Sequence, residues 1–222
     1  MSITQNITGL KESLPAGVTL VAVSKFHPVE ALKEAYDAGQ RVFGESRAQE
    51  LTAKQRVLPG DIEWHFIGPL QSNKVKDIAP FIHTIQSIDT LKLLSEVNKQ
   101  AVRNDRVIRV LLEIHVAEED AKHGFSPEEC RRLLQSGELD GLSNIQICGL
   151  MGMATNTEDE VLIKQEFHTL YALYSELKAG YFKEADYFRE LSMGMSHDYL
   201  LAIREGSTMI RVGTSIFGER EY

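Results

Sequence analysis

Lys25 is a residue whose type and position could do chemistry. It directly follows an apolar run over residues 18–24, Val-Thr-Leu-Val-Ala-Val-Ser, whose β-branched residues are typical of a buried strand. A lysine at the carboxyl end of a barrel strand presents its amine where ligands bind in such folds. A desolvated amine is held neutral and can attack a carbonyl group to form a Schiff base, whereas the alternative interpretation is a solvated surface lysine.

Two predicted helix starts near the end of the chain could bind an anion. Ser196 follows a glycine-containing turn and is predicted to begin one helix, and Gly213 and Thr214 are predicted to begin the last one. The free N–H groups and the dipole at a helix start attract negative charge. Gly213 permits close approach of a ligand, and the Thr214 hydroxyl can donate a hydrogen bond. Taken singly, each start could equally be an ordinary cap or a tight turn.

The chain alternates between predicted strands and helices, and this alternation would position the candidate residues. Eight strands are expected, over residues 18–25, 41–44, 62–67, 83–86, 107–115, 145–151, 187–193 and 208–212. A helix is expected after each strand, and helix caps are predicted at Ser46, Asp89, Ser126 and Thr157. Strict alternation implies an α/β fold with a parallel sheet, and eight units fit a single closed (β/α)8 barrel over residues 1–222. An open, doubly wound sheet is the alternative.

In a closed barrel the last strands lie next to the first, so Lys25 and the two helix starts would face one cavity. Phosphate sites recur at the carboxyl ends of strands seven and eight of such barrels. A ligand with a phosphate at one end and a carbonyl group at the other would bridge these residues. Pyridoxal phosphate has this shape, and the pattern favours it as the ligand.

Five segments together resemble the YggS/PROSC family of pyridoxal phosphate homeostasis proteins, over essentially the whole chain. They are residues 22–25, 43–45, 64–74, 191–196 and 206–218. The resemblance implies a TIM barrel like the amino-terminal domain of alanine racemase, which is fold type III of the pyridoxal phosphate proteins. It also implies that Lys25 holds the cofactor as an internal aldimine and that Arg211 faces the pyridine nitrogen. The phosphate would be surrounded by Ser196, Gly213 and Thr214.

Two further residues are assigned to the cofactor site. Met195 precedes Ser196 near the end of a predicted strand. Ser46 follows Phe-Gly-Glu, where the family usually has asparagine, and a hydroxyl offers one donor where an amide offers two. If the asparagine of the family orients the cofactor ring, we expect that contact to be weaker at Ser46 or replaced by water, and Ser46 keeps its predicted capping role with Gln49.

The remaining composition indicates a soluble, cytoplasmic protein, and we expect a monomer. The net charge of −8 argues against nucleic-acid binding, and no signal-peptide pattern or membrane-length apolar stretch is present. Cys130 and Cys148 have neither metal-ligand nor disulfide spacing. His65 and Glu113 are interpreted as structural, with a catalytic role for His65 as the alternative, and no catalytic or metal-ligating residue is assigned.

Three functions are compatible with these residues. The leading one is a non-enzymatic protein that binds pyridoxal phosphate, buffers it and delivers it to apo-enzymes that need it. The chain ends after the eighth unit, without the second domain that supplies a tyrosine opposite the lysine in alanine racemase, and this favours the carrier. The second function is a pyridoxal phosphate-dependent racemase or lyase of small amino acids. The third is a cofactor-free Schiff-base aldolase, which is disfavoured because Lys25 follows the first strand instead of a later one.

Overall fold

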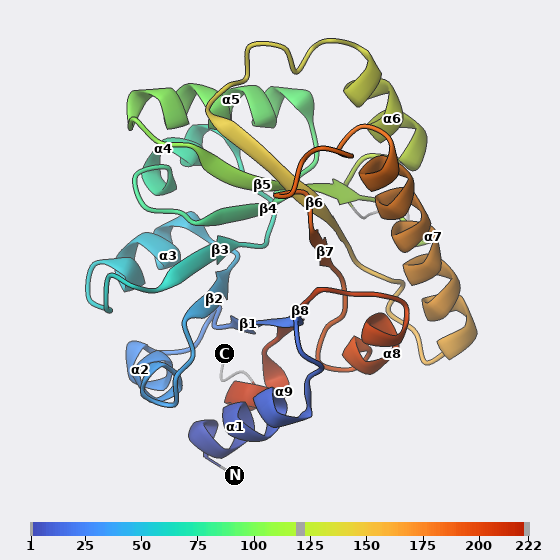
Figure 1. Ribbon diagram of the computed structural model, residues 1–222. Helices are drawn as coiled ribbons and strands as arrows, with labels where there is room; N and C mark the ends of the chain where they lie inside the picture. Colours follow the sequence, from blue (N-terminus) through green and yellow to red (C-terminus); the bar gives the residue numbers. More distant parts are fainter. Residues whose placement is uncertain (1, 119–122, 220–222) are drawn as a thin grey trace.

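The computed structural model describes residues 2–118 and 123–219. Its strands are parallel and pair in chain order, and the last strand pairs with the first to close a barrel (Figure 1). The strands are β1 (Thr19–Val23), β2 (Val42–Glu45), β3 (Glu63–Phe66), β4 (Thr84–Ile88), β5 (Ile108–Ile114), β6 (Ile145–Gly152), β7 (Glu190–Ser192) and β8 (Met209–Val212). The predicted (β/α)8 barrel is confirmed, and the open sheet was the wrong alternative.

Helices surround the barrel, and at least one follows each strand (Figure 1). They are α1 (Ile3–Ser13), α2 (Val29–Asp37), α3 (Ala48–Gln55), the 3-10 turn η1 (Ser72–Lys74), α4 (Val75–Ile78), α5 (Leu91–Arg103), α6 (Pro127–Gln135), α7 (Glu160–Ala179), α8 (Tyr199–Arg204) and α9 (Thr214–Phe217). The first and last helices pack together, and Asn6 Nδ2 donates to the Ile216 carbonyl oxygen at 2.9 Å. Among the described residues, no helix is both long and apolar enough to cross a membrane.

Strand β3 shows how the alternation of a strand separates the apolar core from the barrel interior. Trp64 and Phe66 are buried in the hydrophobic core, and His65 between them points the other way. Its ring contacts Gln86 on β4, and Gln86 accepts a hydrogen bond from Ser192 on β7. Because β4 and β7 are not neighbours in the sheet, these polar side chains meet inside the barrel.

The predicted helix caps agree with the structure only in part. Ser126 caps α6 and forms the expected capping box. The cap of α5 is Thr90 where Asp89 was predicted, and the cap of α7 is Asp159 where Thr157 was predicted. In each case the helix begins one or two residues later than predicted, and an oxygen-bearing side chain nearer to it accepts its first free N–H groups.

Ser46 does not cap a helix, so this prediction was wrong. Helix α3 begins two residues later, and its N-cap is Arg47, whose side chain makes no capping hydrogen bond. Arg47 keeps an extended backbone and places its guanidinium carbon 4.6 Å from the centre of the Phe26 ring. The extended backbone is the usual conformation of an N-cap residue, and the cation–π contact joins the start of α3 to the turn after β1.

Ser196 does not begin a helix either. Helix α8 starts three residues later, at Tyr199, and Asp198 is its N-cap. Asp198 Oδ1 accepts the Met195 N–H at 2.5 Å, which closes a turn over residues 195–198 ahead of the helix. Ser196 therefore lies within a turn, whereas Gly213 and Thr214 begin α9 as predicted.

Candidate functional site

A cavity of about 240 Å³ lies at the carboxyl ends of β1, β3, β6, β7 and β8. It is lined by Val23, Lys25, Ile67, Met153, Met195, Ser196, His197, Arg211, Gly213 and Thr214. Six of the seven residues that the sequence assigns to a cofactor site therefore share one cavity. Parallel pairing of β8 with β1 brings the two ends of the chain together here.

Lys25 lies two residues beyond the end of β1 and is half-buried in the cavity wall. Buried polar contacts fix the residue before it. The Ser24 hydroxyl donates to Glu45 Oε1 at 2.6 Å, and Lys54 Nζ donates to the Ser24 carbonyl oxygen at 2.8 Å and to Glu45 Oε1 at 2.7 Å. Burial raises the pKa of Glu45, and the charge of Lys54 opposes this shift.

The residue after Lys25 is fixed by the same group of charges. The Phe26 N–H donates to Glu50 Oε1 at 2.7 Å, and Lys54 Nζ donates to the same oxygen at 2.7 Å. Phe26 has a φ of +68°, a left-handed conformation that costs a residue with a side chain about 1 kcal/mol. The contacts of Glu50 and Lys54 offset this cost and hold the turn that carries Lys25.

Arg211 is buried in the wall of the cavity, where two acceptors orient its guanidinium group. Nη1 donates to Ser192 Oγ at 2.6 Å, and Nη2 donates to the Gly152 carbonyl oxygen at 2.9 Å. Burial lowers the pKa of Arg211 to about 10, and the charges of Glu113 and Asp198 oppose this shift. The group therefore stays charged at neutral pH and can only donate hydrogen bonds to a ligand.

Two turns that contact each other form the anion end of the cavity. The Gly213 N–H donates to Ser196 Oγ at 3.2 Å, which joins the turn after β7 to the start of α9. A Cβ atom on Gly213 would lie 3.1 Å from the Val23 carbonyl oxygen, so glycine allows the backbones to approach here. The first N–H groups of α9 and the hydroxyls of Ser196 and Thr214 provide hydrogen-bond donors without a cationic side chain.

Ser46 does not line the cavity that contains Lys25. It lies in a neighbouring pocket of about 350 Å³ together with Arg47 and Lys74. The backbone of Gly68 packs against it so closely that a Cβ atom there would come within 2.6 Å of Ser46 Cβ. A contact between Ser46 and the cofactor ring stays a prediction.

Two residues of the site escape sequence reasoning. His197 lines the cavity, and its Nε2 lies 3.3 Å from Asp198 Oδ2. The signal in the sequence that could have identified His197 is its position directly after Ser196, a predicted site residue. Lys54 looks like a surface residue of a helix that pairs with Glu50 four residues earlier, and only the fold shows that it is buried.

This arrangement suits a small molecule that carries a carbonyl group and an anionic group. The Lys25 amine lies on one wall, the donors around Ser196 and Gly213 form another, and the Arg211 guanidinium is fixed between strands. Such a site at the carboxyl ends of the strands defines the class of ligand-binding (β/α)8 barrels.

The chain matches the family described as alanine racemase, N-terminal domain, over residues 1–221. A pyridoxal phosphate homeostasis protein of Pasteurella multocida is 37% identical over 237 residues, which cover 100% of this chain and 99% of that protein. The protein of the same name from Aquifex aeolicus is 40% identical over 204 residues, covering 91% of this chain and 87% of that protein.

Solved structures agree with these sequence matches. PipY of Synechococcus elongatus with pyridoxal phosphate bound superimposes with a TM-score of 0.85 at 38% identity, covering 98% of this chain and 100% of that chain. An alanine racemase of Clostridium difficile has a TM-score of 0.77 at 17% identity and is covered over 56% of its length, which supports the fold alone. The chain belongs to the YggS/PipY pyridoxal phosphate homeostasis proteins, within the alanine racemase N-terminal domain family. The resemblance in the sequence is thereby confirmed.

Proposed function

We propose that this chain binds pyridoxal phosphate in the cavity at Lys25, links it as a Schiff base, and stores and delivers it to apo-enzymes without turnover of its own. One observation carries the proposal: a single cavity combines Lys25, Arg211 and the donors of Ser196, Gly213 and Thr214. The family supports it, because the 38% identical PipY has a structure with pyridoxal phosphate bound.

The residues of the cavity fit this cofactor. Lys25 supplies the amine for the aldehyde, and the turn at Ser196 with the start of α9 supplies N–H and hydroxyl donors for the phosphate. When bound, pyridoxal phosphate supplies a ring that accepts electrons from a substrate carbon. Arg211 is held by Ser192 and Gly152 and stays charged, so beside the ring nitrogen it would leave that atom unprotonated and weaken the acceptance of electrons.

Storage is favoured over turnover by what surrounds Lys25. Racemisation needs a second acid or base on the opposite face of the substrate from the lysine. Within the described part of the chain, the residues that line this cavity include no carboxylate and no tyrosine, and His197 is the one imidazole among them. The lining therefore favours binding and release of the cofactor.

A second function, a pyridoxal phosphate-dependent racemase or lyase of small amino acids, has one observation in its favour. His197 lines the cavity and lies 3.3 Å from the carboxylate of Asp198. A carboxylate beside an imidazole can orient the ring for proton transfer, as in general acid–base catalysis.

Exchange of the α-proton distinguishes the two functions. The holo-protein is incubated with small amino acids in deuterated water, and transfer of the cofactor to an apo-enzyme is followed in parallel by the activity restored. We expect transfer, with exchange far slower than about 1 per second, the low end of ordinary enzymatic turnover. Faster exchange that disappears in Lys25→Ala would contradict storage. If His197→Ala also removes it while the exposed His168→Ala does not, His197 is the second acid or base.

A further inference from the structure

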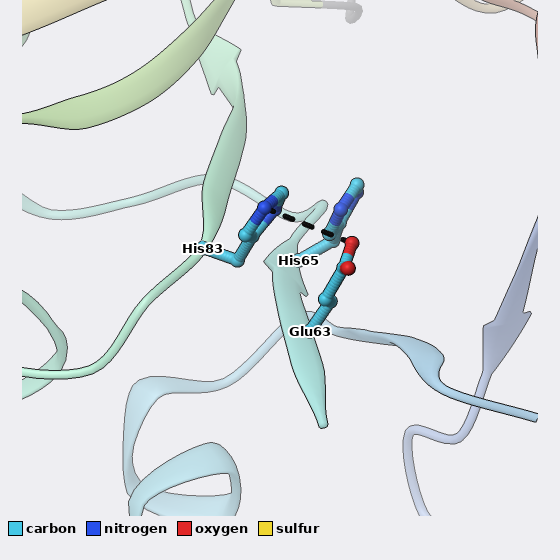
Figure 2. A group of neighbouring side chains, drawn as sticks. All are labelled: Glu63, His65 and His83. Carbon is cyan, nitrogen blue, oxygen red and sulfur yellow. Dashed lines mark ion pairs between the residues drawn. The ribbon is translucent and has the colours of Figure 1, made fainter. Parts of the chain in front are cut away.

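A second group of ligand-type side chains lies at the end of the barrel opposite Lys25. Glu63 is the first residue of β3, His65 follows two residues later, and His83 directly precedes β4 (Figure 2). They line a cavity of about 230 Å³ together with Arg109 and Glu190, at the start of β5 and β7. Because the strands are parallel, their amino ends share one end of the barrel, away from the cofactor cavity.

Strand geometry brings these three side chains together. Glu63 and His65 lie on the same side of β3, since alternate residues of a strand face the same way. Pairing of His65 with Thr84 places His83 beside them, and the two imidazole rings stack with centroids 5.5 Å apart and planes 9° apart. His83 Nε2 lies 3.7 Å from Glu63 Oε2 (Figure 2), and one ligand atom from each residue lies within 4.8 Å of the others.

Each histidine has its other ring nitrogen held by a neighbour. His83 Nδ1 lies 2.9 Å from Thr84 Oγ1, and His65 Nδ1 lies 2.8 Å from Gln86 Nε2. Nε2 is therefore the nitrogen of each ring that could face a metal ion. In metal-binding histidines the outer nitrogen donates a hydrogen bond to its neighbour, and this bond fixes the orientation of the ring.

The hydrogen bonds of His65 allow its Nε2 to become a ligand. Gln86 Oε1 accepts from Ser192 Oγ at 2.6 Å, and Ser192 Oγ accepts from Arg211. With Gln86 donating to Nδ1, His65 carries its proton on Nε2. If the Gln86 amide is rotated by half a turn, His65 Nδ1 can donate to Gln86 Oε1, and the lone pair of His65 Nε2 becomes free to bind a metal ion. Ser192 Oγ would then accept from both Gln86 and Arg211, and its own hydrogen would give up Gln86 Oε1 as its acceptor, so one buried hydrogen bond is exchanged for another.

We propose that Glu63, His65 and His83 bind a divalent transition-metal ion with the ligand preference of Zn²⁺. Imidazole nitrogen and carboxylate oxygen are zinc ligands, and three protein ligands leave one position for water from the cavity. Zinc bonds of about 2.0–2.2 Å place tetrahedral ligand atoms about 3.4 Å apart, so ligand atoms that lie within 4.8 Å of one another need to close by up to about 1.4 Å. The side chains of Glu63 and His83 are 49% and 37% exposed, and both have room to rotate.

The surroundings tolerate an added cation. Arg109 Nη2 lies 3.1 Å and Arg189 Nε lies 3.6 Å from Glu190 Oε1, so both arginines share one carboxylate, and Glu63 brings a further negative charge to the site.

Direct metal titration tests the site. The full chain is dialysed to remove free pyridoxal phosphate, which chelates metals, and is titrated with Zn²⁺ by calorimetry and with Co²⁺ as a visible probe. We expect one metal ion per chain and the intense bands of tetrahedral Co²⁺. No thiolate charge-transfer band should appear, because burial raises the pKa of Cys130 to about 12 and that of Cys148 to about 11. A thiolate band, or no binding below about 1 mM, would overturn the proposal.

Variants separate this site from adventitious binding. His83→Asn and Glu63→Gln each remove one ligand at a partly exposed position and should weaken Zn²⁺ binding about tenfold or more. His168→Asn is the matched control, since His168 is exposed and lies 3.4 Å from a carboxylate oxygen of Glu205. Unchanged affinity in both ligand variants, or an equal loss in the control, contradicts the site. Circular dichroism checks each fold, and Glu63→Gln alone decides the matter if His83→Asn unfolds.

Discussion

Lys54 is a charged side chain that the protein encloses almost completely. It is 5% exposed, and its ammonium group donates to the Ser24 carbonyl oxygen, Glu45 and Glu50. Three acceptors match the three ammonium hydrogens and compensate for the loss of water. Because Ser24 directly precedes Lys25, this buried lysine helps to set the position of the proposed Schiff-base residue.

Replacing Lys54 tests this role. Lys54→Met should lower the free energy of unfolding by about 3–5 kcal/mol, because it leaves Glu45 buried without its charged partner. Urea unfolding measures the change. Lys99→Met is the matched control, since Lys99 is exposed and lies 3.6 Å from Glu96, and such a pair contributes about 0.5 kcal/mol. Similar losses in the two variants would show that the buried contacts add nothing.

The buried carboxyl group of Glu113 should make the free energy of unfolding depend on pH. Burial raises its pKa to about 7; the charge of Asp89 adds to the shift, and that of Arg211 opposes it. The folded state therefore binds the proton more tightly than the unfolded chain does. The resulting stability is present below about pH 4.5 and is lost as the pH rises through about 7. Over this pH range the free energy of unfolding of the wild type should fall by about 3 kcal/mol relative to that of Glu113→Gln. Urea unfolding at several pH values measures the difference. Parallel profiles for the two proteins would refute the shift.

At the scale of elements, the turn between β7 and α8 shapes the anion end of the cavity. Gly194 has a φ of +98°, and a Cβ atom there would lie 2.7 Å from Ala202 Cβ and 2.9 Å from Tyr199 Cα. Its carbonyl oxygen accepts the Arg211 N–H at 2.9 Å, which ties the turn to β8. Both the conformation and the space require glycine at this position.

Gly194→Ala should therefore lower the free energy of unfolding by about 2 kcal/mol or more. It should also weaken retention of pyridoxal phosphate, because Ser196 lies in the displaced turn. Thermal unfolding and equilibrium dialysis measure the two effects. Gly9→Ala is the control, since a Cβ atom on Gly9 in α1 meets nothing within 4 Å. Alanine in this helix should raise the free energy of unfolding by about 0.5–1 kcal/mol. An unchanged melting temperature for Gly194→Ala would contradict the geometry of the turn.

The elements could be predicted wherever a local pattern determines them. The start of α6 at Ser126 combines a cap, a proline and a glutamate within four residues, and it was predicted correctly. The start of α3 was predicted wrongly, because Ser46 and Gln49 match a capping box, whereas the observed N-cap, Arg47, makes no capping hydrogen bond and carries no such signal. Near Ser196, two oxygen-bearing side chains compete to precede the helix, and the sequence alone does not rank Asp198 above Ser196.

At the scale of the whole molecule, a closed barrel was the favoured prediction because eight alternating units fit one, although the count alone leaves an open sheet as an alternative. Closure also explains why Lys25 and Gly213 could be expected in one cavity, since β1 pairs with β8. The polar contacts inside the barrel could not be predicted. Gln86 and Ser192 meet across the interior, and no local pattern links positions so distant in the chain. Their hydrogen bonds join the support of Arg211 to His65 at the other end of the barrel.

The Schiff base at Lys25 is tested most directly by trapping it. The holo-protein is reduced with borohydride and digested, and the modified peptide is identified by mass spectrometry. We predict the adduct on Lys25, loss of the cofactor's visible absorbance in Lys25→Ala, and an unchanged adduct in Lys74→Ala, which alters a lysine of the neighbouring pocket. An adduct on another lysine, with the absorbance intact in Lys25→Ala, would contradict the proposed site.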